Sequence, residues 1–327
     1  MSSSIKDVAR LAGVSNATVS RALGNKPHVR PEVRRRVIEA AEELNYRPSR
    51  VARSLRVQRS NILGLIISDI QNPFFTSLVR AVEDTAYNSE YALFLCNSDE
   101  ETEKEELYIE LLIAEQVAGV IITPTSERDN PAYRLLEAGI PVVTVDRRML
   151  DLPVDAVVVD NAEATRSLTQ HLIDNGHRRI GAIFGPKKMT TGRKRYEGFV
   201  GAMRENGIAV DDDIVFCVPP KEKQGFEYTC RILEKKPPTA LIAGNNLLGS
   251  GALSAIRAAN LTIPDDIQLT VFDDPSWTSL VSPPLTVVSQ PTYALGRTAA
   301  ELLLRRINEP DGPIQEVVLK SRLIVRS

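Results

Sequence analysis

The chain has 327 residues, 43% of them hydrophobic, which is enough apolar material for two or three globular domains. The formal net charge is only −2, but it divides unevenly: residues 1–60 hold 13 Lys and Arg against 5 Asp and Glu, whereas the remainder holds 27 against 37. A head of +8 joined to a body of −10 is typical of a nucleic-acid-binding module attached to a second domain.

The cysteine spacing and the lack of long apolar runs exclude further classes. Cys96, Cys217 and Cys230 lie far apart with no Cys-x-x-Cys pair, which argues against a disulfide framework or a structural zinc site. We therefore expect reduced thiols, no metal site and no cofactor. The first residues lack the apolar run of a secretion signal and no stretch reaches about 18 apolar residues, which predicts a cytoplasmic protein without a membrane partner.

Residues 1–46 are predicted to form an all-α, three-helix head of the helix-turn-helix type. Apolar residues at helical spacing indicate a first helix that ends at Gly13 and a second that follows the N-cap Ser15. A third helix is expected to begin with Pro31 in its first turn. Two short helices that meet at a glycine turn could also form a generic helical mini-domain, so the polar face of the second helix decides the interpretation.

This second helix presents the side chains that a DNA groove requires. Asparagine can bind adenine bidentately, arginine can bind guanine, and alanine or threonine can contact a thymine methyl group, while serine and threonine hydroxyls suit phosphate oxygens. The expected DNA-contacting residues of this helix are Ser15, Asn16, Ala17, Thr18, Ser20 and Arg21. The sequence therefore predicts a head that reads the major groove of double-stranded DNA.

Residues 47–59 are predicted to form a hinge helix and linker. Pro48 can begin a helix, but a segment this short is marginal in water, and arginines crowded onto two turns repel one another. An anionic partner is therefore needed to fold it. If that partner is DNA, the helix forms only in the bound state. The residues expected to face DNA here are Arg50, Arg53 and Arg56.

Two motifs in these residues carry a resemblance to a known family. The runs Ile5-Lys-Asp-Val-Ala-Arg-Leu-Ala-Gly-Val-Ser-Asn-Ala-Thr-Val-Ser-Arg21 and Leu44-Asn-Tyr-Arg-Pro-Ser-Arg-Val-Ala-Arg-Ser-Leu55 resemble the head and hinge helix of the lac repressor (LacI/GalR) family of transcription regulators. The resemblance covers essentially the full chain. It implies that Asn25 and His28 contact the DNA backbone, and that Leu55 enters the minor groove at the operator centre and kinks it.

The body, residues 60–327, alternates short apolar runs with amphipathic stretches. The predicted strands are 62–68, 92–96, 119–123, 142–145 and 156–159, and then 180–184, 214–218, 240–243 and 268–272. Predicted helices at 75–89, 103–116 and 130–138 separate the first strands. This alternation indicates parallel sheets covered on both faces. Because the series starts again near residue 180, we predict two doubly wound lobes, the first at about 60–160 and 291–320 and the second at about 161–290 and 321–327.

Polar side chains follow several of the predicted strands. Ligands of such sheets bind beyond the carboxyl ends of the strands, and a cleft between lobes is the default pocket. The strand-end candidates for effector binding are Asp69, Asn72, Phe74, Asp146, Arg147, Arg195, Asn246 and Asp273. Carboxylates, amides, arginines and aromatic faces together suit a sugar, which offers hydroxyl groups and an apolar ring face. Trp277, the only tryptophan, either stacks on the effector or packs near the mouth of the cleft.

The body also resembles the α/β periplasmic-binding-protein fold of sugar receptors. Asn72-Pro-Phe-Phe75 and Val145-Asp-Arg147 are similar to the ribose-binding members. The resemblance implies an anchoring role for Arg195, a second-lobe carboxylate at Asp273 and a contact from Gln290 at the crossover between lobes. A ribose-type pentose is therefore the favoured effector.

Two positions depart from that pattern. The usual Asn-Asp pair of the second lobe is Asn245-Asn246 here, and an aromatic residue expected near Pro219-Pro220 is missing. The loss of a carboxylate at position 246 leaves a nucleoside, a sugar acid or a sugar phosphate open as the effector.

The C-terminal part is expected to contain a segment at 286–290 that leads back toward the first lobe, a helix at 294–307 and a closing strand at 316–324. No leucine heptad follows that strand, which predicts a homodimer on a palindromic operator.

An enzyme and a transport protein are the two alternatives to a transcription regulator. An enzyme is disfavoured because Gly244 and Gly249 have phosphate-loop spacing but Ser250 stands at the lysine position, and no Gly-x-Ser-x-Gly elbow or metal-ligand histidine spacing occurs. A transport solute-binding protein would share the body but would lack the basic head. We therefore expect a non-enzymatic repressor of a carbohydrate operon, with the effector acting either as inducer or as corepressor.

Overall fold

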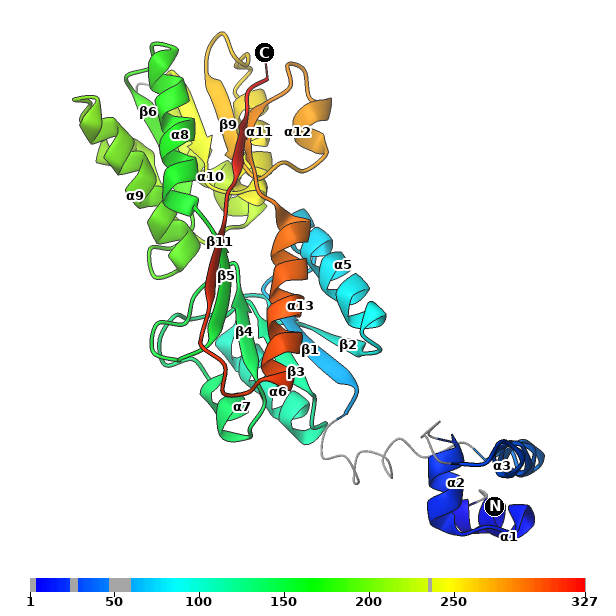
Figure 1. Cartoon of the computed structure of the whole chain (residues 1–327). Helices are drawn as coiled ribbons and strands as arrows, with labels where there is room; N and C mark the ends of the chain where they lie inside the picture. Colours follow the sequence, from blue (N-terminus) through cyan, green and yellow to red (C-terminus); the bar gives the residue numbers. More distant parts are fainter. Residues whose placement is uncertain (1–3, 24–28, 47–59, 235–236, 327) are drawn as a thin grey trace. The chain divides into compact units, whose positions relative to one another are not determined.

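A computed structural model of the chain describes residues 4–23, 29–46, 60–234 and 237–326. The chain divides into two compact units, residues 1–60 and 61–327 (Figure 1). No helix among the described residues is long and apolar enough to span a membrane.

The head consists of three helices, as predicted. They are α1 (Ile5–Ala12), α2 (Asn16–Leu23) and α3 (Pro31–Glu43). A capping box joins Ser4 to Asp7 at the start of α1, and Gly13 ends this helix with a left-handed φ of 65°. The small core between the helices contains the fully buried side chains Val8, Val19 and Val37.

The first lobe of the body contains a six-stranded, fully parallel sheet in the order β11-β5-β4-β3-β1-β2. Its strands are β1 (Ile62–Ile67), β2 (Ala92–Asn97), β3 (Gly119–Ile122), β4 (Val142–Val145), β5 (Asp155–Val159) and β11 (Glu316–Leu319). Its helices are α5 (Pro73–Asn88), α6 (Thr102–Ala114), α7 (Tyr133–Glu137) and α13 (Thr292–Asn308). The central strands are buried on both faces, which is why they read as continuous apolar runs in the sequence.

The second lobe repeats this plan in the order β12-β10-β9-β8-β6-β7. Its strands are β6 (Ile180–Phe184), β7 (Val215–Cys217), β8 (Ala240–Ala243), β9 (Gln268–Phe272), β10 (Thr286–Ser289) and β12 (Arg322–Ile324). Its helices are α8 (Asn161–Asp174), α9 (Thr190–Glu205), the 3-10 helix η1 (Asp212–Ile214), α10 (Glu222–Glu234), α11 (Asn246–Ala258) and α12 (Trp277–Leu280). Two parallel-sheet lobes with helices on both faces were predicted, and this prediction is confirmed (Figure 1).

The prediction of one closing strand at 316–324 is wrong, because this segment forms two strands in different sheets. β11 pairs in parallel with β5 of the first lobe, whereas β12 pairs antiparallel with β10 of the second. Between them the Ser321 backbone N–H donates to Asp160 Oδ1 at 2.9 Å, which holds the chain where it passes from one sheet to the other. The polar run Lys320-Ser321-Arg322 separates the two apolar runs of this segment, so the sequence did contain a signal for the crossing.

Candidate functional site

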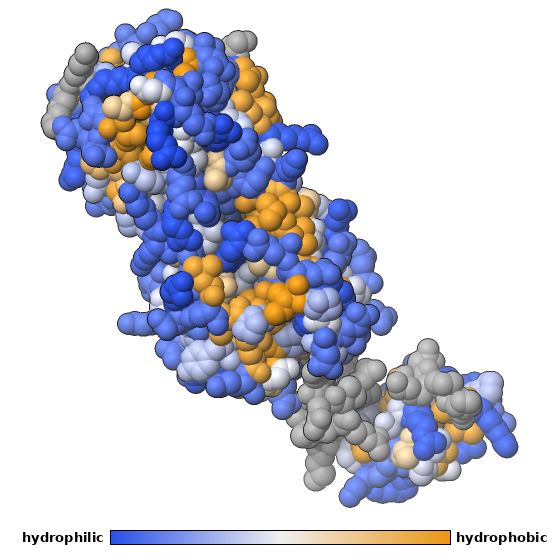
Figure 2. Space-filling view, turned by 60° about the vertical axis from the view of Figure 1, so that its left-hand side comes forward, coloured by the Kyte–Doolittle hydropathy of each residue, from blue (hydrophilic) through white to orange (hydrophobic). Residues whose placement is uncertain are grey.

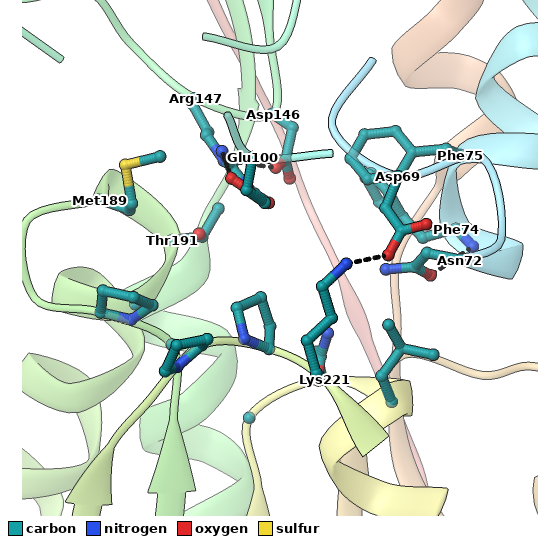
Figure 3. Close-up of a pocket in the computed structure, with 18 of the residues that line it drawn as sticks. Asp69, Asn72, Phe74, Phe75, Glu100, Asp146, Arg147, Met189, Thr191 and Lys221 are labelled. Carbon is teal, nitrogen blue, oxygen red and sulfur yellow. Dashed lines mark hydrogen bonds and ion pairs between the residues drawn. The ribbon is translucent and has the colours of Figure 1, made fainter. Parts of the chain in front are cut away.

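A cavity of about 320 Å³ lies between the two lobes of the body (Figure 3). It is lined by residues that follow strands of both sheets, the position at which α/β sheets bind ligands. The predicted effector-binding residues that line it are Asp69, Asn72, Phe74, Asp146, Arg147, Arg195, Asp273 and Gln290. The structure therefore brings together side chains that are more than 200 residues apart in the sequence.

The loop after β1 and the start of α5 form the aromatic part of the wall. Pro73 occupies the first turn of α5, and the side chain of Asn72 caps the helix by accepting from the Phe74 backbone N–H at 3.0 Å. Phe74 and Phe75 pack edge to face with their ring centroids 5.0 Å apart. Helix capping thus fixes the aromatic side chains beside the cavity.

Arg147 and Asp146 follow β4 and are both buried. The Arg147 guanidinium donates to both carboxylate oxygens of Glu100, with Nη1 2.7 Å from Oε2, and to the carbonyl oxygen of Pro124 at 3.1 Å. Asp146 differs, because within the described part of the chain its carboxylate has only a 3.7 Å ion pair with Arg147 Nε. Burial raises the pKa of Asp146 to about 6. Its oxygens are therefore available as acceptors for a ligand.

Arg195 projects from α9 and is anchored from two sides. Its Nε donates to Asn161 Oδ1 at 2.7 Å, its Nη1 donates to the Gly244 carbonyl oxygen at 2.6 Å, and its guanidinium carbon lies 3.7 Å from the Phe272 ring centroid. Both acceptors are neutral, and burial lowers the pKa of this guanidinium. Arg195 is thus a buried, rigidly held cation at the cavity wall, suited to a ligand oxygen.

Asp273 follows β9 and accepts three hydrogen bonds within the protein. Its Oδ2 accepts from the backbone N–H and the side-chain Nδ2 of Asn246 at 3.1 and 3.0 Å, and its Oδ1 accepts from Gln290. Asp273 and Asp146 both have a left-handed φ, of 81° and 69°. Such backbone conformations are concentrated at functional sites, and here they occur at the strand ends that face the cavity.

The structure places two of the named residues away from this cavity. Asn246 lines a second, smaller cavity of about 210 Å³, and its Nδ2 donates to Asn72 Oδ1 at 2.7 Å as well as to Asp273. Trp277 packs against the apolar core of the second lobe, which favours its packing role over stacking on an effector.

Sequence reasoning missed four charged residues of the wall, Asp99, Glu100, Lys188 and Lys221, and two of them make contacts that shape the cavity. Glu100 binds Arg147, and Lys221 Nζ lies 2.7 Å from Asp69 Oδ2, from the opposite lobe (Figure 3). Both follow edge strands of their sheets, β2 and β7, so their positions after a strand carried a usable signal. Among the described residues no group of three or more His, Cys, Asp or Glu side chains could hold a metal ion.

In the head, the predicted DNA-contacting residues lie along α2 and its N-terminus. Ser15, Asn16 and Arg21 are exposed, whereas Ala17, Thr18 and Ser20 are half-buried. Ser15 Oγ accepts from the Thr18 backbone N–H at 3.2 Å, so this residue is the predicted N-cap. The remaining predicted DNA contacts lie outside the described residues; they are Asn25, His28, Arg50, Arg53, Leu55 and Arg56.

The chain matches two family descriptions, one for each unit. Residues 4–49 match "Bacterial regulatory proteins, lacI family", and residues 60–325 match "Periplasmic binding proteins and sugar binding domain of LacI family". The chain belongs to the lacI family. The resemblance predicted from the head and hinge motifs is thereby confirmed, and the chain is a DNA-binding transcription regulator.

Individual members of the lacI family match over nearly their whole length. The ribose operon repressor of Halalkalibacterium halodurans is 38% identical, over 98% of this chain and 96% of the relative. The transcriptional repressor PurR of Pasteurella multocida is 35% identical, over 98% and 97%. The crystal structure of the lac repressor dimer bound to operator and the anti-inducer ONPF matches with a TM-score of 0.86 and 27% identity, over 100% of this chain and 98% of that one.

Proposed function

We propose that this lacI-family protein represses a carbohydrate operon, binding a palindromic operator as a homodimer under the control of a small sugar-like effector. The observation that carries the effector assignment is the pair of buried groups that face the cavity, the Asp146 carboxylate and the Arg195 guanidinium. A sugar hydroxyl can donate to the first and accept from the second, and an apolar ring face can pack on Phe74. The similarity to a ribose operon repressor supports a pentose.

Exposed apolar side chains on the first lobe support the homodimer. Phe94 and Leu95 lie on the edge strand β2, and Leu107 and Leu111 lie on α6; they are 37%, 41%, 62% and 46% exposed. Figure 2 shows apolar patches that interrupt the hydrophilic surface of the body. An exposed apolar surface on a folded unit favours association with another chain.

The proposed mechanism couples the cleft to DNA through the dimer. An effector that changes the angle between the lobes shifts the dimer interface, and this changes the free energy of docking two heads on two half-sites. Whether the effector releases or strengthens DNA binding follows from which lobe arrangement it prefers.

A thermal-shift screen of residues 60–327 tests the effector assignment. Pentoses, hexoses, nucleosides, sugar acids and sugar phosphates are compared, and a ligand at 100 times its dissociation constant adds about 2.7 kcal/mol of stability. The shift should disappear in Arg195→Ala. No shift from any class, or a shift retained in Arg195→Ala, would contradict the assignment.

The DNA assignment is tested separately with a duplex selected from a random pool by the full chain. The full chain should bind this duplex, whereas residues 60–327 should not. Equal binding by the body alone would contradict the role of the head.

A further inference from the structure

Two ion pairs join the lobes across the cleft. Lys221 Nζ lies 2.7 Å from Asp69 Oδ2, and Arg193 Nη1 lies 2.8 Å from Glu127 Oε2. Thr190 donates a further hydrogen bond to Glu127. In both pairs the carboxylate belongs to the first lobe and the cation to the second.

The same division of charge holds for the walls of the cavity. The charged residues that line it from the first lobe are Asp69, Asp99, Glu100, Asp146 and Arg147. Those that line it from the second lobe are Lys188, Arg195, Lys221 and Asp273. The first wall is therefore net negative and the second net positive. Because facing walls of opposite sign attract, the charge distribution itself favours approach of the lobes.

The burial of the two ion pairs determines how strongly they stabilise the contact between the lobes. Fully exposed ion pairs stabilise little, because water and salt screen them. Here the carboxylates are largely buried, with Asp69 and Glu127 side chains 11% and 5% exposed, while Lys221 and Arg193 are 43% and 31% exposed. The two ion pairs therefore stabilise the closed arrangement of the lobes more than fully exposed pairs would. Because their cations are partly exposed, dissolved salt can still weaken them.

A hydrogen bond adds a third link between the lobes. Asn246 Nδ2 of the second lobe donates to Asn72 Oδ1 of the first at 2.7 Å and to Asp273 Oδ2 at 3.0 Å. An ionised carboxylate at position 246 could not donate either bond. The asparagine is therefore what allows this link.

We propose that Lys221 and Arg193 are positioning residues that hold the two lobes closed, through Asp69 and Glu127, by the protein's own contacts. This deepens the proposed function by adding a control of the same cleft, and its regulatory meaning rests on that function. An effector then selects a closed arrangement that the chain already favours, and it reaches the cavity only while the ion pairs are open.

The closure is measured as a distance between spin labels on the two lobes of the full chain, without DNA or effector. Glu103→Cys on α6 and Lys223→Cys on α10 are exposed attachment sites near the cleft. Cys217→Ser and Cys230→Ser remove the half-buried thiols, and Cys96 is buried. Labelled chains are mixed with an excess of unlabelled chains, so that only distances within one protomer are recorded.

The parent protein should give one short, narrow distance distribution. The double variant Lys221→Met with Arg193→Met should lengthen the mean distance by several ångströms and broaden it. Salt of about 1 M, where the Debye length is about 3 Å, should shift the parent in the same direction.

Lys188→Met is the matched control. Lys188 is an exposed lysine of the same wall for which no ion pair is found among the described residues. This variant removes wall charge without breaking an ion pair, so it should lengthen the mean distance much less than the double variant does. Asp69→Lys combined with Lys221→Asp restores one pair with reversed sign, so its distance distribution should lie closer to the parent distribution than that of the single variant Lys221→Met.

An unchanged distance in the double variant, or equal lengthening in Lys188→Met, would overturn the proposal. Because neither DNA nor effector is present, such a result would leave the proposed regulator function standing. A failure of the DNA and effector tests would conversely leave the measured closure unaffected.

Discussion

Asp146 and Asp273 show how the surroundings of one residue type decide its chemistry. They follow β4 and β9, which occupy the same place in the strand orders of the two sheets, and both have left-handed backbones. Among the residues that the structure describes, Asp273 accepts three hydrogen bonds, whereas the Asp146 carboxylate has only a 3.7 Å ion pair with Arg147. Asp273 therefore holds Asn246 and Gln290 in place, whereas the carboxylate of Asp146 remains available to a ligand.

Asp146→Asn should stabilise the body at neutral pH. The folded pKa of Asp146 is about 6, above the ordinary value of 3.8, so the folded state binds the proton more tightly than the unfolded state does. Stability is therefore lost as pH rises from about 4 to about 6 and stays lower above that range. The variant should gain about 1–3 kcal/mol at pH 7 and nothing below pH 4, measured by urea unfolding without ligand.

Asp273→Asn is the matched variant at the equivalent strand end. Its new amide would face donors of Asn246 and Gln290, which should destabilise the body by about 1–3 kcal/mol at pH 7. Loss of stability in Asp146→Asn at pH 7 would mean that its carboxylate has partners within the protein.

Arg21→Ala should relax sequence preference rather than abolish DNA binding. Arg21 is exposed on α2, where it can bind a guanine edge. Discrimination between the selected duplex and a duplex with one changed half-site base pair should fall by about 1–3 kcal/mol in fluorescence-anisotropy titrations. Arg35→Ala on α3, also an exposed arginine of the head, should preserve the discrimination. Loss of discrimination in Arg35→Ala but not in Arg21→Ala would mean that Arg35, and not Arg21, reads the base pair.

At the scale of elements, close helix packing depends on glycine. In α11, a Cβ on Gly251 would lie 2.1 Å from the Glu222 carbonyl oxygen of α10. Gly251→Ala should therefore push α10 and α11 apart and destabilise the body by about 1–3 kcal/mol in thermal unfolding.

Gly201→Ala is the control for this prediction. Gly201 lies in α9 with no atom within 4 Å of an added Cβ, so alanine should be neutral or stabilise by up to about 1 kcal/mol. Equal effects of the two substitutions would show that helix propensity, and not packing, controls both.

The hinge helix predicted at residues 47–59, which lie outside the described residues, also has a testable role. If this helix forms only on DNA, Leu55→Ala should reduce operator bending and affinity while leaving effector binding intact. Bending is measured by energy transfer between dyes at the duplex ends, and affinity by titration. An unchanged bend would show that Leu55 does not act as a wedge and that the hinge serves as a tether.

For the whole molecule, the coupling between DNA and effector must be reciprocal. If effector changes operator affinity by a given factor, operator must change effector affinity by the same factor. Calorimetric titration of the full chain with the effector found by the thermal-shift screen should therefore give different affinities with and without the selected duplex. Equal affinities would rule out allosteric control by that ligand.

Much of this protein is determined by its sequence alone. The basic head, the polar side chains of α2 and the repeated alternation of strands and helices all follow from local composition and periodicity, which act over a few residues at a time. The polar strand ends at Asp69, Asp146 and Asp273 could also be located, because the carboxyl ends of parallel strands meet at one edge of a sheet.

Only the tertiary structure decided which of these groups meet. Lys221 and Asp69 pair across 152 residues, Asn246 turns toward Asn72 and Asp273, and the segment at 316–324 divides between two sheets. No local sequence pattern predicts the partners in these contacts, because each one forms only when two separately folded lobes approach each other. The sequence thus determines the parts of the cleft, and the packing of one lobe against the other decides their pairing and charge.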